Sequence, residues 1–256
     1  MKFISKFLIL TLLLISSNKI IAQENSIKDS LITIKSKNIK FKFKQLIIPT
    51  TLIAYGFIGI ESDGLKDWNL GIREEVVENI DKKITIDDFS QYAPAISVYA
   101  LNLGGIKGKN NLRDRTIILG TSYLLMGTSV YALKKITNID RPDGSAFAFP
   151  SGHTATAFAG AEFLWQEYKD VSIWYGISGY LVATGTGAFR IYNNKHWLTD
   201  VATGAGIGIL TTKIAYWIFP YLDNHIFKSK KNISSAMVAP FYNGNQMGVG
   251  MILNLK

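Results

Sequence analysis

Eight residues in three short segments have the types and spacing needed to handle a phosphate group. They are three cations, two histidines, one aspartate and a Ser-Gly pair: Lys134, Arg141, Ser151, Gly152, His153, Arg190, His196 and Asp200. An arginine offers a planar pair of N–H donors that matches phosphate oxygens, and a lysine adds a point charge. Taken singly, each cation would be an ordinary surface charge. Together they predict phosphoryl chemistry that needs no metal ion.

His196 and Asp200 are four positions apart, so they share one face if a helix begins near His196. The carboxylate can then hold one ring nitrogen protonated and leave the other free to attack phosphorus. A lone His–Asp pair is more often an ordinary hydrogen bond. Here a second histidine and three cations accompany it, which favours a catalytic pair.

Ser151 and Gly152 come directly before an expected helix over residues 154–165. This position places backbone N–H groups and a hydroxyl at the positive end of the helix, where an anion binds well. Glycine also permits close approach of the backbone to a ligand. Alone, such a pair is usually just a helix cap.

The three segments resemble the type 2 phosphatidic acid phosphatase (PAP2) family, which shares its fold with vanadium haloperoxidases and class A acid phosphatases. The family pattern is K-x6-R-P, then P-S-G-H, then S-R-x5-H-x3-D. This chain departs from it only at Phe189, where the family usually has serine. The resemblance covers about residues 114–220.

The resemblance implies a role for each residue of the set. His196 would be the nucleophile that forms a phosphohistidine, Asp200 would orient it, and His153 would protonate the leaving oxygen. The remaining residues would hold the phosphoryl group: Lys134, Arg141, Ser151, Gly152 and Arg190. No cofactor and no metal are implied.

These residues fall at the ends of four expected helices, over residues 116–133, 154–165, 173–188 and 198–219, the last one stopped by Pro220. In an up-and-down bundle successive helices run antiparallel, so these ends share one face. Small residues in the last three helices allow close packing.

Upstream of that bundle, apolar segments at 46–60 and 89–103 and an amphipathic segment at 67–83 predict further helices. The expected fold class is therefore all-α, a PAP2-like bundle of about six helices. The tail adds a possible small β hairpin, because residues 237–242 and 247–253 flank an Asn-Gly-Asn turn signal. A lone hairpin is marginal in water, so the alternating residues 39–44 are expected to join it as a third strand.

The N-terminus has the charged, apolar and small-residue order of a secretory signal peptide, with cleavage expected after Ala22. An uncleaved anchor is the alternative. The expected organisation is a signal peptide (1–22), a basic lead-in (23–45), a helical PAP2-like phosphatase domain (46–226) and a tail (227–256).

Composition narrows the possible partners. Removing the signal peptide removes three lysines and no acids, so the net charge falls from +9 to +6. The six lysines between Lys28 and Lys44 suit an anionic membrane surface, or form a solvated face. No nucleic-acid motif is present, so nucleic acid is not an expected partner. The absence of cysteine excludes disulfides.

The membrane topology stays open. A cleaved signal places the mature N-terminus outside, and three crossings would then put Lys134 inside. The basic loop at 107–115 predicts the opposite orientation. Either the first apolar segment does not cross, or the bundle is a periplasmic domain at the membrane surface. Both solutions give an exported protein with its site on the periplasmic side.

The expected function is hydrolysis of phosphate monoesters or diphosphates, with lipid phosphates as substrates. Four aromatic residues beside the motifs line an acyl-chain entrance or belong to the core: Phe147, Phe149, Phe189 and Trp197. Three alternatives remain: a vanadium-dependent haloperoxidase, a soluble periplasmic non-specific acid phosphatase, and a non-enzymatic envelope protein.

Overall fold

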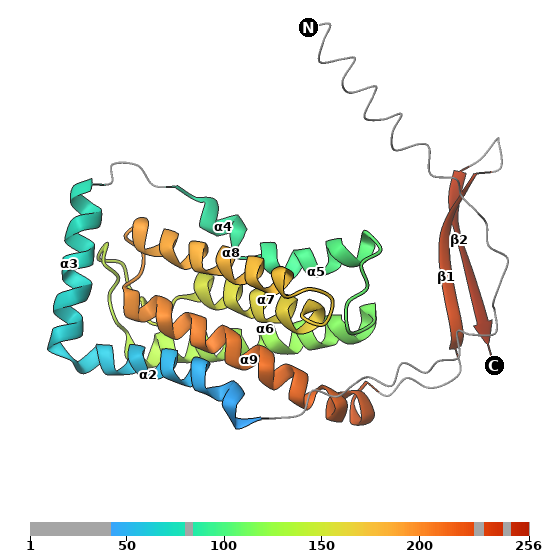
Figure 1. Ribbon diagram of the computed structural model, residues 1–256, viewed down its shortest axis with the longest axis horizontal. Coiled ribbons are helices and arrows are strands. Elements are labelled where there is room, and N and C mark those ends of the chain that lie inside the picture. Colours follow the sequence, from blue (N-terminus) through green and yellow to red (C-terminus); the bar gives the residue numbers. More distant parts are fainter. Residues whose placement is uncertain (1–41, 80–83, 228–232, 243–246, 256) are drawn as a thin grey trace, which may run out of the picture. The chain divides into compact units, whose positions relative to one another are not determined.

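The computed structural model describes residues 42–79, 84–227, 233–242 and 247–255. The expected signal peptide and most of the basic lead-in lie outside the described residues. The helices, shown in Figure 1, are a short 3-10 helix η1 (Phe43–Leu46) followed by α2 (Ile47–Glu61), α3 (Asp63–Asn79), α4 (Ile86–Ser90), α5 (Ala93–Leu103), α6 (Leu112–Thr137), α7 (Gly152–Tyr168), α8 (Ile173–Tyr192) and α9 (Leu198–His225).

The all-α class is confirmed for this helical body. Within residues 42–79 and 84–227 no strand is present. The eight α-helices described exceed the expected bundle of about six, because the amphipathic segment at 67–83 adds α3 and the segment at 89–103 is not one helix. It is split into α4 and α5, with Pro94 in the first turn of α5. Proline has no N–H to donate to the preceding turn, so Pro94 suits the start of a new helix and cannot continue α4.

The prediction that Pro220 ends the last helix was wrong, because α9 continues to His225. An internal proline removes one backbone hydrogen bond and costs about 3 kcal/mol. Contacts on both sides of it offset that cost. Phe219 is buried, and the Asp223 carboxylate accepts a hydrogen bond of 2.8 Å from Arg113, at the start of α6.

Helix α7 is the centre of the body and packs against α5, α6, α8 and α9 (Figure 1). Its approach to α9 depends on two glycines of α9. A Cβ atom at Gly204 would lie 2.5 Å from the carbonyl oxygen of Ser151, and one at Gly208 would lie 2.3 Å from that of Ala155. These distances confirm that small residues allow the helices to approach closely.

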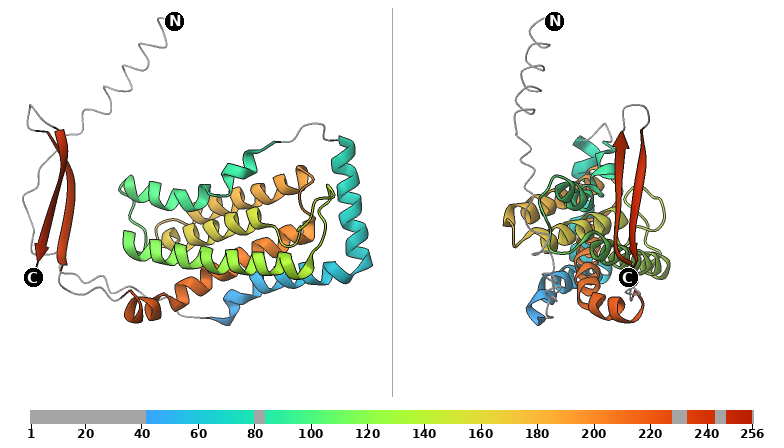
Figure 2. Two further views of the ribbon diagram at one scale, coloured as in Figure 1. Left: turned by 180° about the vertical axis from the view of Figure 1, so that it is seen from behind. Right: turned by 90° about the vertical axis from the view of Figure 1, so that its right-hand side faces the viewer.

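Helix α3 runs across the ends of its neighbours instead of along them (Figure 2). Two side chains fasten it there. Asn69 donates a hydrogen bond of 3.1 Å to the Thr199 hydroxyl in α9, and Arg73 Nε donates one of 2.9 Å to the carbonyl oxygen of Pro142. Helix α3 is therefore anchored beside the loops that carry the sequence motifs.

The tail contains β1 (Ile233–Tyr242) and β2 (Met247–Leu255), which pair antiparallel, while the turn signal at 243–246 lies outside the described residues. The expected third strand is not supported. Phe43 and Lys44 belong to η1, which leads directly into the apolar helix α2, and residues 39–41 are not described. The sheet among the described residues has two strands.

Three described helical segments are long and apolar enough to cross a membrane: Phe43–Glu61, Leu112–Thr137 and Leu198–His225. The first of them exposes large apolar side chains, among them Ile48 and Ile58. A row of this kind on a helix surface is typical of contact with lipid or with another protein. The helical body therefore has the composition of a membrane protein.

Candidate active site

Two sets of backbone hydrogen bonds join the helix ends that carry the motifs. The N–H of Ser151, before α7, donates to the carbonyl oxygen of Asp200, near the start of α9, at 3.0 Å. The N–H groups of Lys195 and His196 donate to the carbonyl oxygen of Arg190, at the end of α8, at 3.0 and 3.3 Å. The starts of α7 and α9 and the end of α8 therefore meet.

His196 and Asp200 form a buried pair. The ring is 2% exposed, and its Nδ1 lies 3.3 Å from Asp200 Oδ2. The same carboxylate oxygen accepts the backbone N–H of Trp197 at 2.9 Å, so it is fixed at the first turn of α9. Nδ1 is accordingly assigned the proton, which leaves Nε2 with a free lone pair.

The charge state of His196 follows from its surroundings. Burial, followed by the positive charges of Lys134, Arg141 and Arg190, lowers the pKa of His196 well below its usual value. The ring is therefore neutral at physiological pH. A neutral imidazole is the form that can act as a nucleophile.

Lys134 is held at the C-terminal end of α6. Its ammonium donates to the carbonyl oxygens of Phe147 and Ala148, the second at 3.2 Å. Phe147 has a left-handed backbone, with φ of 64°, which is unusual for a bulky residue. The loop before α7 is thus shaped around the lysine.

The two arginines each retain an unsatisfied donor. Arg141 Nε and Arg190 Nε are buried and have no hydrogen-bond partner within the described part of the chain. A buried donor without a partner costs roughly 1–3 kcal/mol, and more when it is charged. Two such donors beside a buried histidine are what a site for an oxyanion requires.

Ser151 is fully buried and caps α7. Its hydroxyl oxygen accepts the N–H of Thr154 at 3.4 Å and lies 2.9 Å from the Thr154 hydroxyl. Gly152 is the first residue of the helix, and a Cβ atom there would make only an ordinary contact of 3.7 Å with Val130. Packing within the chain does not require this glycine, so the anion-binding role stays a prediction.

The loop that carries Arg141 is held by side chains from elsewhere. Lys195 Nζ lies 2.7 Å from the Asp143 carboxylate, and Trp197 Nε1 donates to the carbonyl oxygen of Asp140 at 2.9 Å. Burial raises the pKa of Asp143, but hydrogen bonds from Lys195 and Ser145 outweigh it, and the pKa is lowered. This carboxylate therefore stays charged and keeps the loop in place.

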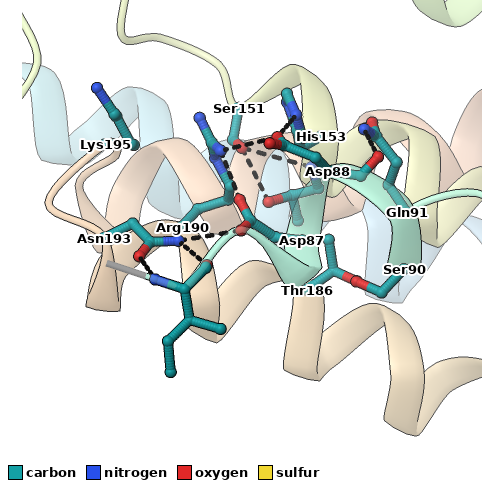
Figure 3. A network of polar contacts seen from close by, with 12 residues as sticks. Asp87, Asp88, Ser90, Gln91, Ser151, His153, Thr186, Arg190, Asn193 and Lys195 are labelled. Atoms are coloured by element: carbon teal, nitrogen blue, oxygen red, sulfur yellow. Dashed lines mark hydrogen bonds and ion pairs between the residues drawn. The ribbon is translucent and has the colours of Figure 1, made fainter. Parts of the chain in front are cut away.

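Two acidic residues of α4 were not predicted. Asp87 Oδ2 lies 2.5 Å from Arg190 Nη1, and Asp88 Oδ1 lies 3.0 Å from His153 Nε2. Figure 3 shows both carboxylates directed at the arginine and the histidine. No sequence motif pointed to them, because both lie on the short helix α4, 65 and 103 residues before the side chains that they contact.

Asp87, Asp88 and His153 have donor atoms within 4.8 Å of one another, close enough to hold a cation. However, the Arg190 guanidinium lies beside both carboxylates, at 2.5 Å from Asp87 and 3.9 Å from Asp88. A second positive charge there would be repelled. We therefore assign these groups to ion pairing.

A cavity of about 260 Å³ lies next to Asp200, between α2, α3 and the motif loops. Of the four aromatic residues that were expected at an acyl-chain entrance or in the core, Phe149 and Trp197 line this cavity. Phe147 instead lies under the Lys135 ammonium, and Phe189 packs edge-on against Tyr192. The cavity is mostly apolar and adjoins the buried histidine pair.

Parts of the chain are similar to known proteins. Residues 115–223 match the model of the PAP2 superfamily. Lipid A 1-phosphatase of Porphyromonas gingivalis is 37% identical over 172 residues, which make up 63% of this chain and 38% of that protein. The chain thus spans less than half the length of this curated relative.

Two solved structures are similar in part. LpxE of Aquifex aeolicus has 24% identity and a TM-score of 0.45, covering 58% of this chain and 94% of that one. A transmembrane PAP2-type phosphatidylglycerolphosphate phosphatase of Bacillus subtilis has 21% identity and a TM-score of 0.44, covering 72% and 99%.

Proposed function

We propose that this chain hydrolyses lipid phosphates, as monoesters or diphosphates, through a phosphohistidine intermediate and without a metal cofactor. The observation that carries the proposal is the position of His196. It is buried, neutral and held by Asp200, in reach of the charges of three cations. Two of those cations, Arg141 and Arg190, keep a buried N–H group unused.

In the first step the phosphoryl oxygens bind to Lys134, Arg141 and Arg190 and to the backbone N–H groups at the start of α7. His196 Nε2 attacks phosphorus, and the bond from phosphorus to the leaving oxygen breaks. His153 gives its proton to that oxygen. The phosphorylated ring is positively charged, and the Asp200 carboxylate stabilises it through Nδ1–H.

In the second step a water molecule attacks the phosphohistidine. The now neutral His153 takes a proton from this water, the bond between Nε2 and phosphorus breaks, and inorganic phosphate leaves. Both histidines return to their starting states. The chain's own cations and helix end supply the stabilisation of the phosphoryl charge.

Two observations support a lipid substrate, in addition to the 37% sequence identity with a lipid A 1-phosphatase. Three helical segments within the described residues are long and apolar enough to cross a membrane, and the apolar cavity with Phe149 and Trp197 adjoins Asp200. We infer that lipid A phosphates belong to the substrate range. We place the site on the periplasmic side. Protease accessibility of residues 134–153 in intact spheroplasts tests this placement.

The function is tested by phosphate release from a panel of lipid A, phosphatidic acid, phosphatidylglycerol phosphate and isoprenyl diphosphate. Wild-type protein in detergent should release phosphate from at least one of these lipids, and vanadate should inhibit the release. His196→Ala should be inactive on all. Equal rates for wild type and variant would discard the mechanism.

A further inference from the structure

We propose that Asp88 is a positioning residue for His153: its carboxylate binds the Nε2–H of the ring and keeps the imidazolium charged until Nδ1 delivers its proton to the leaving oxygen. The proposal rests on the phosphatase function above and adds a residue that lies outside all three sequence motifs. Asp88 comes from α4, 65 positions before the histidine that it contacts.

The contact itself is well formed. Asp88 Oδ1 lies 3.0 Å from His153 Nε2. Arg190 Nη1 is also within ion-pair distance of the same oxygen but lies farther away, at 3.9 Å. The His153 side chain is 31% exposed and that of Asp88 51%. The pair therefore faces the open side of the site, where a leaving group departs and water enters.

The neighbouring residues hold α4 in position, which leaves Asp88 free for this contact. Asp87 is 1% exposed and binds Arg190 and the Asn193 amide, the latter at 3.0 Å. Asn193 also binds both backbone groups of Ile84, at 3.0 and 2.7 Å. The Ser90 and Thr186 hydroxyls, 2.8 Å apart, fasten the other end of α4 (Figure 3).

Charge explains why His153 needs this partner. The groups that act on it are Arg190 from α8 and the two carboxylates of α4. Burial and then Arg190 lower the pKa of His153, and the hydrogen bond and charge of Asp88 offset only part of the decrease. Without Asp88 the ring would lose its proton at a lower pH. A general acid without its proton cannot assist the leaving group.

The contact also fixes which nitrogen works. With Nε2–H bound to Asp88, Nδ1 is the nitrogen left for the substrate. After it gives its proton to the leaving oxygen, the neutral ring still carries Nε2–H, and Nδ1 can accept a proton from water in the second step. One hydrogen bond thus sets the tautomer for both half-reactions.

The test compares pH profiles of kcat/KM for wild type, Asp88→Asn and Asp88→Glu, with Asp170→Asn as the control. Asp170 is an exposed acid just beyond the C-terminal end of α7, away from the motifs. Near neutral pH, Asp88→Asn should lose about tenfold, a part of the 10²–10⁴ that general acid catalysis supplies. Its alkaline limb should move to lower pH, so the loss shrinks in acid. Asp88→Glu should restore most of the rate.

Two further measurements separate this role from a structural one. The loss should be smaller for p-nitrophenyl phosphate, whose good leaving group needs little protonation, than for an alkyl phosphate. In a His153→Gln background, Asp88→Asn should cause no additional loss, because both changes remove the same function. Thermal unfolding of each variant checks that it is folded.

A loss in Asp88→Asn that is equal at every pH and for both leaving groups would overturn the proposal, as would an unchanged rate. In either case an active wild type and an inactive His196→Ala would leave the phosphatase function standing. If instead wild type and His196→Ala release phosphate equally, or neither releases any, the proposed phosphatase function itself fails.

Discussion

The site contains two His–Asp pairs with opposite surroundings. His196 and Asp200 are four residues apart, and each side chain is 2% exposed. His153 and Asp88 are 65 residues apart, and their side chains are 31% and 51% exposed. The sealed pair suits a nucleophile that must be oriented and kept neutral. The open pair suits proton exchange with a leaving group and with water.

The comparison shows how the causes of a pKa shift differ between two imidazoles in one pocket. Burial lowers the pKa of both rings. At His196 the surrounding cations lower it further, whereas at His153 the Asp88 carboxylate opposes the decrease. Titratable groups whose environments separate their pKa values are typical of an acid and a nucleophile working together.

The largest effect is expected at the centre of the sealed pair. His196→Ala removes the proposed nucleophile and should lower kcat by roughly 10³-fold or more. Phosphate release measures this loss. Quenching wild type with SDS at alkaline pH after mixing with ³²P-labelled substrate should trap a phosphoenzyme that is stable in base, is lost in acid and is absent from the variant. A labelled His196→Ala protein would place the nucleophile elsewhere.

Asp200→Asn should come next, with a loss on the order of 10²- to 10⁴-fold, because an amide no longer fixes the Nδ1–H tautomer. Asp88→Asn in the open pair should cost about tenfold at neutral pH. Parallel rate measurements on the two variants test the comparison directly. An Asp88→Asn loss as large as that of Asp200→Asn would break it.

Arg190 connects the open pair to the buried part of the site through Asp87. Arg190→Gln leaves the Asp87 carboxylate buried without its cation, which should destabilise the fold by about 3–5 kcal/mol. Adding Asp87→Asn should recover much of the stability without restoring activity. Urea unfolding in detergent measures both variants, and an Arg190→Gln protein as stable as wild type would contradict the ion-pair role.

The smallest effect concerns the packing behind the sealed pair. Gly204→Ala places a Cβ atom 2.5 Å from the Ser151 carbonyl, and overpacking of this kind costs about 1–3 kcal/mol. Gly185→Ala in α8 is the matched control, since no atom lies within 4 Å of its Cβ position. The control should be neutral or stabilised by up to about 1 kcal/mol. Melting temperatures of the two variants should therefore move apart.

Much of the molecule was predictable because it depends on neighbours along the chain. The apolar segments and their breaks predicted the helical class, and the short spacing of His196 and Asp200 predicted that they lie close together, although His196 precedes α9 instead of sharing a helix face with Asp200. The antiparallel order of helices then predicted that the motif ends meet. The break before Pro94 could have been read in the same local way.

Other features could not be predicted, because they depend on contacts between distant segments. Proline alone favours a stop at Pro220, and only the Arg113–Asp223 contact and the burial of Phe219 explain why α9 continues. The alternation before α2 favours a strand, yet η1 forms there as part of the helical entry.

The two histidines show most clearly what the sequence determined and what the tertiary structure decided. The sequence by itself brought the sealed pair close, since His196 and Asp200 are four residues apart at the entry to α9, but His196 precedes the helix and the extended N-cap Trp197 brings its ring to the carboxylate. Only the tertiary structure decided the open pair. Asp88 reaches His153 because Asp87, Asn193 and Ser90 fasten α4 to α8, and no local pattern encodes a contact across 65 residues.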